Sequence, residues 1–476
     1  MSSTSLKKQS KSHRYSWSDP GPEADEPSAL APVLSRSGKT PRAAKTVEKF
    51  EKWRRISLYF ALGLVFVRLS MIHQLLEYLL GTDTYLLYFV AIPVLIAIPT
   101  TGGFQRAFKY QPAWYWAAFA LWLLPTSAFS SWKAGSLNIV MGYYRTELVL
   151  LFAIAGLVTT FQECRWLMYT ISWAAVVNII TVLLFRRIDI HGRTSLAFGT
   201  VANSNDYSGH LIFVLPFLLW VILVTRLTIV RIVGFLVLVL ALYEILAAGS
   251  RGAMIGLATA IIVFALTTTP KVRRIVLVTA PVLAMLVIAL LPRSVSHRIF
   301  AFSSDDADAS SEALESSHDR AQLLRDSIAT VFRHPLFGVG TGQFANTEGQ
   351  QTAQSGQRLW YGAHNSFTQV ASENGFPGFI FYLGGVLSSL ILLNKTGRFL
   401  SRKSGVKDAA SAVLCVRIAL ISFCVTIFFL NFGYFFYLPA LAGITIAIAA
   451  SSKQLVIDLK AKESRSPVRS PVQSWS

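Results

Sequence analysis

Apolar runs close to 20 residues long recur along the chain from about Ile56 to Ala450, with short polar connections between them. A helix needs about 20 apolar residues to cross the hydrocarbon core of a bilayer. The pattern therefore predicts an all-α, polytopic membrane protein with about twelve spans. The predicted spans are 56–76, 84–101, 112–131, 143–160, 166–185, 207–225, 230–248, 252–269, 273–291, 377–394, 411–430 and 434–450.

A long polar segment interrupts this pattern between the ninth and tenth spans, and polar tails flank the spans. The segment is the first place to look for chemistry. Its acidic run, Ser303–Asp308, lies among Ser and Ala residues and predicts a mobile, solvated loop. The predicted parts are a disordered basic tail (1–54), nine spans (55–291), a large helical loop (292–376), three spans (377–451) and a second disordered basic tail (452–476).

Composition supports a membrane protein, because 53% of the residues are hydrophobic, 14% are charged and the mean hydropathy is +0.49. The formal net charge of +19 would suit nucleic acid, but the Lys and Arg residues gather in every second connection. This alternation follows the positive-inside rule. Both termini are then cytoplasmic, and the large loop lies outside. None of the three cysteines belongs to a CxxC pair, so no disulfide framework or zinc site is indicated.

Arg251 lies in a tight hairpin, Ala248–Gly252, between two apolar spans. An arginine at that depth is costly unless it has a partner or faces a polar cavity. Arg251 therefore either reaches the lipid headgroups or points at an anionic ligand. The glycines of the hairpin would let such a ligand approach closely.

Within the large loop, Ser316–Arg333 has the pattern of a helix that opens at a Ser or Asp and ends before Pro335. The residues at spacings of three and four on one face are Arg320, Leu324, Ile328 and Val331 with Phe332. We expect this face to pack on the membrane spans. Arg320 on such a face needs an anionic partner, which is either an internal carboxylate or the phosphate of a ligand.

Three alternating glycines follow this helix, in Leu336–Phe344. The run lacks the preceding strand and the following Lys-Ser/Thr of a P-loop, so it predicts a tight turn that docks the helix. A short helix is then predicted over His364–Asn374, because Asn374-Gly375 is a C-cap signal.

His364 stands at the start of that short helix, where the helix dipole favours a neutral imidazole, as a general base requires. The alternative is that His364 only caps the helix. Glu373 is a weaker candidate that orients a partner. Arg193 opens a polar stretch that leads to the sixth span through Asn203 and Asn205, and these residues either line the same site or cap the helix.

In this order, the pieces resemble the O-antigen ligase and O-antigen polymerase superfamily of bacterial envelope glycan enzymes. The resemblance covers about residues 110–450. The motifs that carry it are Ser250-Arg251-Gly252, Arg320, His334–Gly340, His364-Asn365-Ser366 and Glu373–Gly378. Two positions depart from the family pattern: Ser204 replaces the proline of an Asn-Pro-Asn motif, and Leu324 stands where tryptophan is common.

The resemblance implies a GT-C-like glycosyltransferase in the bacterial inner membrane, with a periplasmic site. The implied donor is a glycan on polyprenyl diphosphate, such as undecaprenyl diphosphate. The acceptor is lipid A-core for a ligase or another growing glycan for a polymerase. Transfer would be inverting and would need no metal or other cofactor. The implied residues are His364, Arg320 and Arg251 for catalysis, and Arg193, Asn203, Asn205, Asn365 and Glu373 for substrate binding.

A secondary transporter with twelve spans is the main alternative, supported by Arg68, His73 and Glu77 in the first predicted span. Transporters commonly show repeated halves and ionisable residues near the middle of the membrane. No repeat is evident in this sequence, and the other charged candidates are predicted at the outer face. A non-enzymatic scaffold is a third alternative. Release of polyprenyl diphosphate on addition of acceptor would distinguish an enzyme from both.

Overall fold

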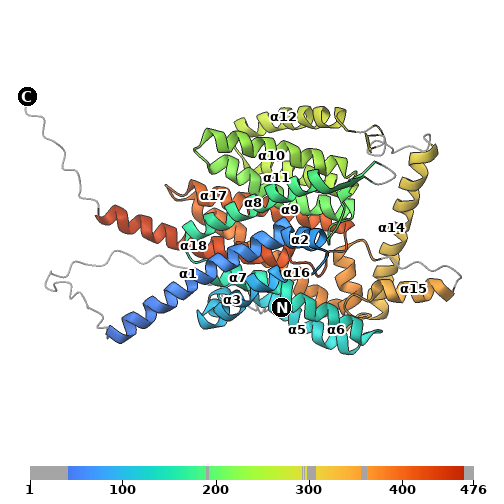
Figure 1. The fold of residues 1–476 in the computed structure, drawn as a ribbon, viewed down its shortest axis with the longest axis horizontal. Helices are drawn as coiled ribbons and strands as arrows, with labels where there is room; N and C mark the ends of the chain where they lie inside the picture. The colour runs from blue at the N-terminus through green and yellow to red at the C-terminus, as the bar shows by residue number, and fades with distance from the viewer. Residues whose placement is uncertain are drawn as a thin grey trace, which may run out of the picture. The chain divides into compact units, whose positions relative to one another are not determined.

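The structure of the protein is a computed structural model, and the residues that it describes are 41–188, 192–291, 293, 295–296, 307–354 and 362–465. From Lys49 onward these residues form one compact unit that is almost entirely helical (Figure 1). The helices are α1 Pro41–Ser70, α2 Ile72–Leu80, α3 Leu86–Thr100, α4 Gly103–Ala107, α5 Gln111–Ala128, α6 Lys133–Gly142, η1 Tyr143–Glu147, α7 Leu148–Leu157, α8 Phe161–Phe185, α9 Ser204–Val224, α10 Thr228–Ala247, α11 Arg251–Thr267, α12 Pro270–Ala289, α14 Ala307–Arg333, α15 Phe344–Gln354, α16 Ser366–Ser401, α17 Lys407–Thr426, η2 Ile427–Phe429 and α18 Tyr437–Arg465.

Each predicted span coincides with a helical segment. Among the described residues, eight helices are long and apolar enough to cross a membrane, or nine if the bent pair α1–α2 counts as one span. The helices α3 and α11 are apolar but shorter. The protein is therefore an all-α protein of the multi-pass membrane type, as predicted, whereas the count of twelve spans and the GT-C-like architecture stay predictions.

The first predicted span is not one straight helix. It breaks at Met71, which has a φ of 58° in the left-handed region, and α1 and α2 meet at 65°. Two of the three residues that favoured a transporter, Arg68 and His73, have structural partners at this bend. Arg68 forms an ion pair with Glu147 on η1 and lies 5.0 Å from the ring centroid of Phe436. His73 Nδ1 donates to the carbonyl oxygen of Val67 at 3.1 Å.

The centre of the bundle is α9, which packs against α8, α10, α11 and α17. Its side chains are buried on nearly every face, which explains why its sequence is apolar throughout rather than amphipathic. Helix α11 approaches α17 closely at Gly256, where an added Cβ would lie 1.9 Å from Thr426 Oγ1. Small residues at helix contacts permit such close approach in membrane proteins. Helix α12 lies at the edge of the bundle, against α10 and α11 (Figure 1).

Three regions are more ordered than the sequence predicted. Helix α1 begins at Pro41 and α18 runs to Arg465, so the inner parts of both predicted tails are helical. Both parts contain several Lys residues, together with Glu and Ala in the first and with Leu and Gln in the second, and these residue types favour helix. Helix α14 begins at Ala307 instead of Ser316. Residues 303–306 of the predicted acidic loop, and residues 1–40 and 466–476 of the tails, lie outside the described residues.

A short antiparallel hairpin departs from the all-α prediction. Strand β1 (Arg186–Ile188) pairs with β2 (Thr194–Leu196), with Arg186 opposite Leu196. Strands of three residues are too short to give a readable period-two pattern in the sequence. The hairpin holds Arg193 beside the start of α9, which brings it to the candidate site.

Candidate active site

A cavity of about 360 Å³ lies where α9, α11 and α16 begin and α17 ends, beside the helix α14. Helix α14 stands across the ends of the bundle helices instead of running along them (Figure 1). The lining residues are Asn205, Gly249, Arg251, Gly252, Ile255, Arg320, Ala321, Leu324, Ala363, His364, Asn365, Phe428 and Phe429. Five of the eight predicted site residues, from four separate segments of the chain, therefore share one cavity.

His364 lies just before α16, not in its first turn. Asn365 is the N-cap, because its Oδ1 accepts hydrogen bonds from the backbone N–H groups of Phe367 at 2.9 Å and Thr368 at 3.2 Å. The capping alternative for His364 is therefore wrong. His364 has a φ of 47°, and its backbone N–H donates to Asn431 Oδ1 at 2.7 Å. This turn leaves the imidazole among the residues that line the cavity.

The electrostatics of the cavity favour a neutral His364. Burial, and then the positive charge of Arg320, lower the pKa of the imidazole below its ordinary value. A neutral imidazole has one ring nitrogen able to accept a proton. The cavity thus places a group able to accept a proton beside cations suited to an anionic ligand.

Arg251 is the first residue of α11 and follows the N-cap Ser250, whose Oγ accepts from the Ala253 N–H at 3.5 Å. Gly249, with a φ of 60°, ends the preceding helix. At Gly252 an added Cβ would lie 2.6 Å from Phe429 Cβ. The two glycines therefore make the hairpin tight and let it touch the end of α17, which brings Arg251 to the cavity.

Helix α14 packs with a face that matches the predicted one only in part. Ile328 and Phe332 are 43% and 71% exposed, so these two positions were predicted wrongly, whereas Val331 is buried as predicted. The buried side chains are Leu323, Ser327, Thr330 and Val331.

The hydrogen bonds of two hydroxyl groups explain why polar residues of α14 lie on its buried face. Ser327 Oγ donates to the Leu324 carbonyl oxygen and Thr330 Oγ1 donates to the Asp326 carbonyl oxygen, both at 2.8 Å. A hydroxyl satisfied within its own helix can be buried at little cost. Arg320 and Leu324, in the first half of the predicted stripe, do line the cavity.

The glycine run Leu336–Phe344 forms the predicted tight turn and docks α14 against α16. The backbone N–H groups of Val339 and Gly340 donate to the carbonyl oxygens of Ser372 and Glu373, each at 3.0 Å. Gly375, with φ 67° and ψ −174°, interrupts α16 at the same place. The predicted short helix is thus real, but it begins at Ser366 and is joined to the following span.

The buried carboxylate of Glu373 stabilises this turn by accepting hydrogen bonds. Its Oε2 accepts from the Gly342 N–H at 2.8 Å and from Tyr434 Oη at 2.6 Å, and its Oε1 accepts from the Phe344 N–H at 3.2 Å. Glu373 is only 2% exposed and is absent from the cavity lining. The geometry therefore assigns it the orienting role that the sequence left open, and does not support direct contact with a substrate.

We expect Gly340→Ala to destabilise the protein by about 2–4 kcal/mol, because it combines backbone strain with overpacking. Gly340 has a φ of 105°, and an added Cβ would lie 2.1 Å from Ser130 Oγ and 2.8 Å from Ser130 Cα. Thermal unfolding in detergent should show the loss as a lower midpoint. The matched control is Gly142→Ala, where an added Cβ meets nothing within 4 Å. Equal midpoints for the two variants would contradict this packing.

In the polar stretch that leads into α9, one asparagine caps the helix and another lines the cavity. Asn203 is the N-cap, since its Oδ1 accepts from the Asn205 N–H at 2.8 Å, and it lies outside the cavity lining. Asn205 lines the cavity. Arg193 donates through Nη2 to Asn205 Oδ1 and through Nε to the Ala248 carbonyl oxygen, both at 3.0 Å. Arg193 therefore ties the β hairpin to α9 and to the hairpin that carries Arg251.

Two supporting residues, Asn431 and Tyr434, lie in the connection between α17 and α18 and were not predicted from the sequence. Asn431 holds the backbone of His364, and Tyr434 Oη accepts from Asn374 Nδ2 at 2.6 Å while it donates to Glu373. Polar groups in a short and otherwise apolar connection were the available signal. Among the described residues, no group of three His, Cys, Asp or Glu residues is arranged to hold a metal ion.

Comparison with known families concerns this same region. Residues 236–383 match the family model described as O-antigen ligase. This stretch of the chain is similar to the O-antigen ligase family. The match supports the O-antigen ligase and polymerase superfamily that the motifs predicted, and it indicates an enzyme of ligase or polymerase type. The comparison with curated proteins gave no match.

The matched range, residues 236–383, contains only part of the cavity. Arg251, Arg320 and His364 fall within the matched range, whereas Asn205 and Phe428 lie outside it.

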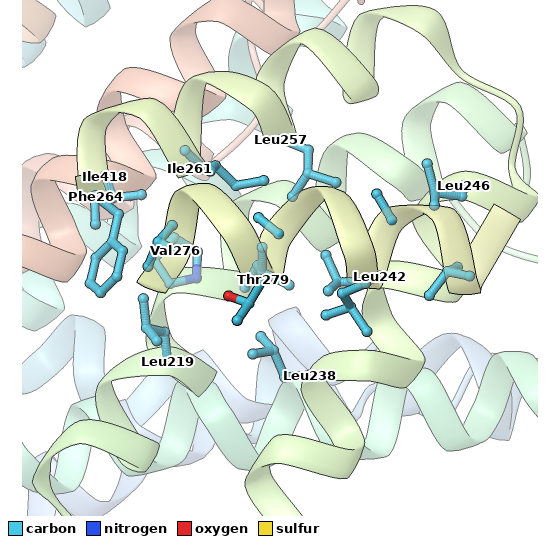
Figure 2. Close-up of a pocket in the computed structure, with 17 residues that line it drawn as sticks. Leu219, Leu238, Leu242, Leu246, Leu257, Ile261, Phe264, Val276, Thr279 and Ile418 are labelled. Atoms are coloured by element: carbon cyan, nitrogen blue, oxygen red, sulfur yellow. The ribbon is translucent and has the colours of Figure 1, made fainter. Parts of the chain in front are cut away.

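A second cavity, of about 230 Å³, is apolar and is lined mainly by residues of the matched range 236–383, between α12 and the pair α10–α11 (Figure 2). Leu238 and Leu242 of α10 and Leu257 of α11 point into it, and Thr279 supplies the one polar side chain of the lining (Figure 2). This cavity and the polar one share the α10–α11 hairpin: Leu246 lines the apolar cavity and Gly249 lines the polar one.

Proposed function

We propose that the protein transfers a glycan from a polyprenyl diphosphate, such as undecaprenyl diphosphate, to an acceptor hydroxyl at the outer face of the bacterial inner membrane. The observation that carries the proposal is one cavity, at the ends of membrane helices, that combines Arg251 and Arg320 with a His364 of lowered pKa. The acceptor we favour is lipid A-core, which makes the protein a ligase. A polymerase would use another lipid-linked glycan.

In the proposed reaction, the acceptor oxygen attacks the anomeric carbon of the donor as the bond from that carbon to the diphosphate oxygen breaks. His364 takes the proton of the acceptor hydroxyl. Arg251 and Arg320 neutralise the charge that develops on the leaving diphosphate. No metal is assigned to the reaction. Attack from the side opposite the diphosphate inverts the configuration of the anomeric carbon.

Two asparagines are placed to contact the sugar. Asn365 uses its Oδ1 to cap α16, which leaves its amide nitrogen as a donor for a sugar hydroxyl. Asn205 accepts from Arg193 and also lines the cavity. Arg193 therefore acts in this proposal by positioning Asn205 and the Arg251 hairpin.

The apolar cavity suits the prenyl chain of the same donor. Its lining is hydrocarbon apart from Thr279, and residues of the α10–α11 hairpin line both this cavity and the polar one. A lipid whose chain lies along α10 and α11 would carry its diphosphate to the end of the membrane helix where Arg251 begins α11. This shared hairpin supports a lipid-linked donor over a water-soluble one.

Acceptor-dependent release of polyprenyl diphosphate tests the function. Purified protein in detergent, given lipid-linked donor, should release free polyprenyl diphosphate only when an acceptor is added. Release that is absent under all conditions, or independent of acceptor, contradicts the proposal. Deletion of the gene separates the two acceptors: loss of all long chains from lipopolysaccharide identifies a ligase, and products with a single repeat identify a polymerase.

The pH profile should report the lowered pKa of His364. Transfer requires the neutral imidazole, so kcat/KM should hold as pH falls past 6.5 and decline only as pH passes below the lowered pKa. Arg320→Gln removes a cation that lowers this pKa, and should shift the decline to higher pH as well as reduce the rate. Measurements between pH 5 and pH 8 would show it. An identical decline in both proteins would argue against this electrostatic coupling.

A further inference from the structure

A third cavity, of about 580 Å³, lies at the opposite end of α16 and α17 from the candidate active site. Its lining residues are Thr267, Asn394, Gly397, Arg398, Ser401, Ala410, Ser411, Val413, Leu414 and Arg417. On α16 these residues recur at intervals of three and four, so they form one face of the helix. The charge pattern of the connections places this end of the bundle on the cytoplasmic side.

The cavity holds two guanidinium groups and no carboxylate among its lining residues. Among the described residues, neither Arg398 nor Arg417 forms an ion pair with an acidic side chain. Positive charge in the cavity is therefore not neutralised within the described part of the chain.

Arg417 gives stronger evidence for a bound ligand than Arg398 does. Its Nη1 donates to Asn394 Oδ1 at a long 3.4 Å, and its buried Nε has no hydrogen-bond partner among the described residues. A buried donor without a partner is costly, and more so on a charged group. Such a group points to an acceptor that comes from outside the chain.

The depth of Arg417 in its membrane span and the direction of its side chain also favour an anionic ligand at the membrane surface. Arg417 lies about 15 Å along the axis of α17 from Lys407, at 1.5 Å per residue. An arginine inside a membrane span is expensive unless it is paired. Helical side chains tilt toward the N-terminus, and α17 begins at the basic end, so the guanidinium extends toward the membrane surface there.

We propose that this cavity binds the phosphate headgroup of an anionic phospholipid from the leaflet opposite the candidate active site. Two guanidinium groups match the phosphate oxygens. Ala410, Val413 and Leu414 in the same lining suit the glycerol and the start of the acyl chains, which a free phosphate ion would not use. Basic pockets between membrane helices are known to hold anionic headgroups.

Native mass spectrometry of the full chain in detergent, with added phosphatidylglycerol, tests this site. The double variant R398Q/R417Q should retain at least about tenfold less of this lipid. The control R402Q/K403Q removes two charges from exposed residues at the same end that are absent from the lining. Equal retention by the two double variants would overturn the proposal, as would equal binding of phosphatidylcholine.

Two further measurements keep the test decisive. Inorganic phosphate, titrated alone, should not bind; phosphate binding without lipid binding would overturn the assignment to a lipid. Arg398 is exposed, so R398Q should fold normally and still show a partial loss of lipid. Full lipid retention by R398Q, with an unchanged unfolding midpoint, would also count against the site.

Discussion

Replacing His364 with alanine should reduce glycan transfer by about 10²- to 10⁴-fold, the range typical for loss of a positioned general base. His364 lines the cavity with Arg251 and Arg320, and its lowered pKa keeps the imidazole neutral. The measurement is the rate of product formation from lipid-linked donor and acceptor, per amount of protein inserted in the membrane.

Two variants control for effects of the backbone and of histidine loss in general. His364 has a positive φ, which Asn tolerates better than Ala, so H364N should keep the fold and still lose activity. H334A removes an exposed histidine that is absent from the cavity lining, and should retain activity. Normal transfer by H364N would refute a role for His364 as the base.

Replacing Arg320 or Arg251 with lysine should lower kcat/KM by about 10- to 100-fold, even though the charge remains. A guanidinium presents two parallel donors to a diphosphate, whereas an ammonium acts as a point charge. Both arginines line the cavity, and a loss from either would show that geometry and charge act together.

The matched control for the α14 arginine is Arg325→Lys. Arg325 is exposed on the same helix and does not line the cavity, so this variant should behave as the unaltered protein does. Unfolding midpoints should be similar for all three lysine variants. If R320K and R251K were as active as R325K, the diphosphate would have to be bound elsewhere.

The membrane helices were predictable because each needs a long apolar run, and local runs are visible in the sequence. The grouping of Arg251, Arg320 and His364 was predictable only through ordered motifs, since these residues are far apart in the chain. Three features depended on contacts that no local pattern encodes. They are the bend at Met71, the face of α14 that buries Ser327, and the hydrogen bond from the His364 backbone N–H to Asn431.

Glu373 shows why residue type alone did not decide a role. From the sequence, Glu373 was a weaker candidate that orients a partner, and the family resemblance implied that it binds substrate. In the structure it instead accepts bonds from two backbone N–H groups and from Tyr434, so it serves the fold of the turn. The decisive partners, Gly342 and Tyr434, become neighbours only when the loop closes on the helices.

The hydrogen bond from the His364 backbone N–H to Asn431 means that an active fragment of this protein must include Asn431. Residues 236–383 are the range that matches the family model, yet Asn205, Phe428 and Asn431 lie beyond its two ends. A fragment cut to that range would lose one wall of the cavity and the hydrogen bond between Asn431 and the backbone of His364. Splitting the gene between α16 and α17 should therefore give two inactive halves that regain activity only when expressed together.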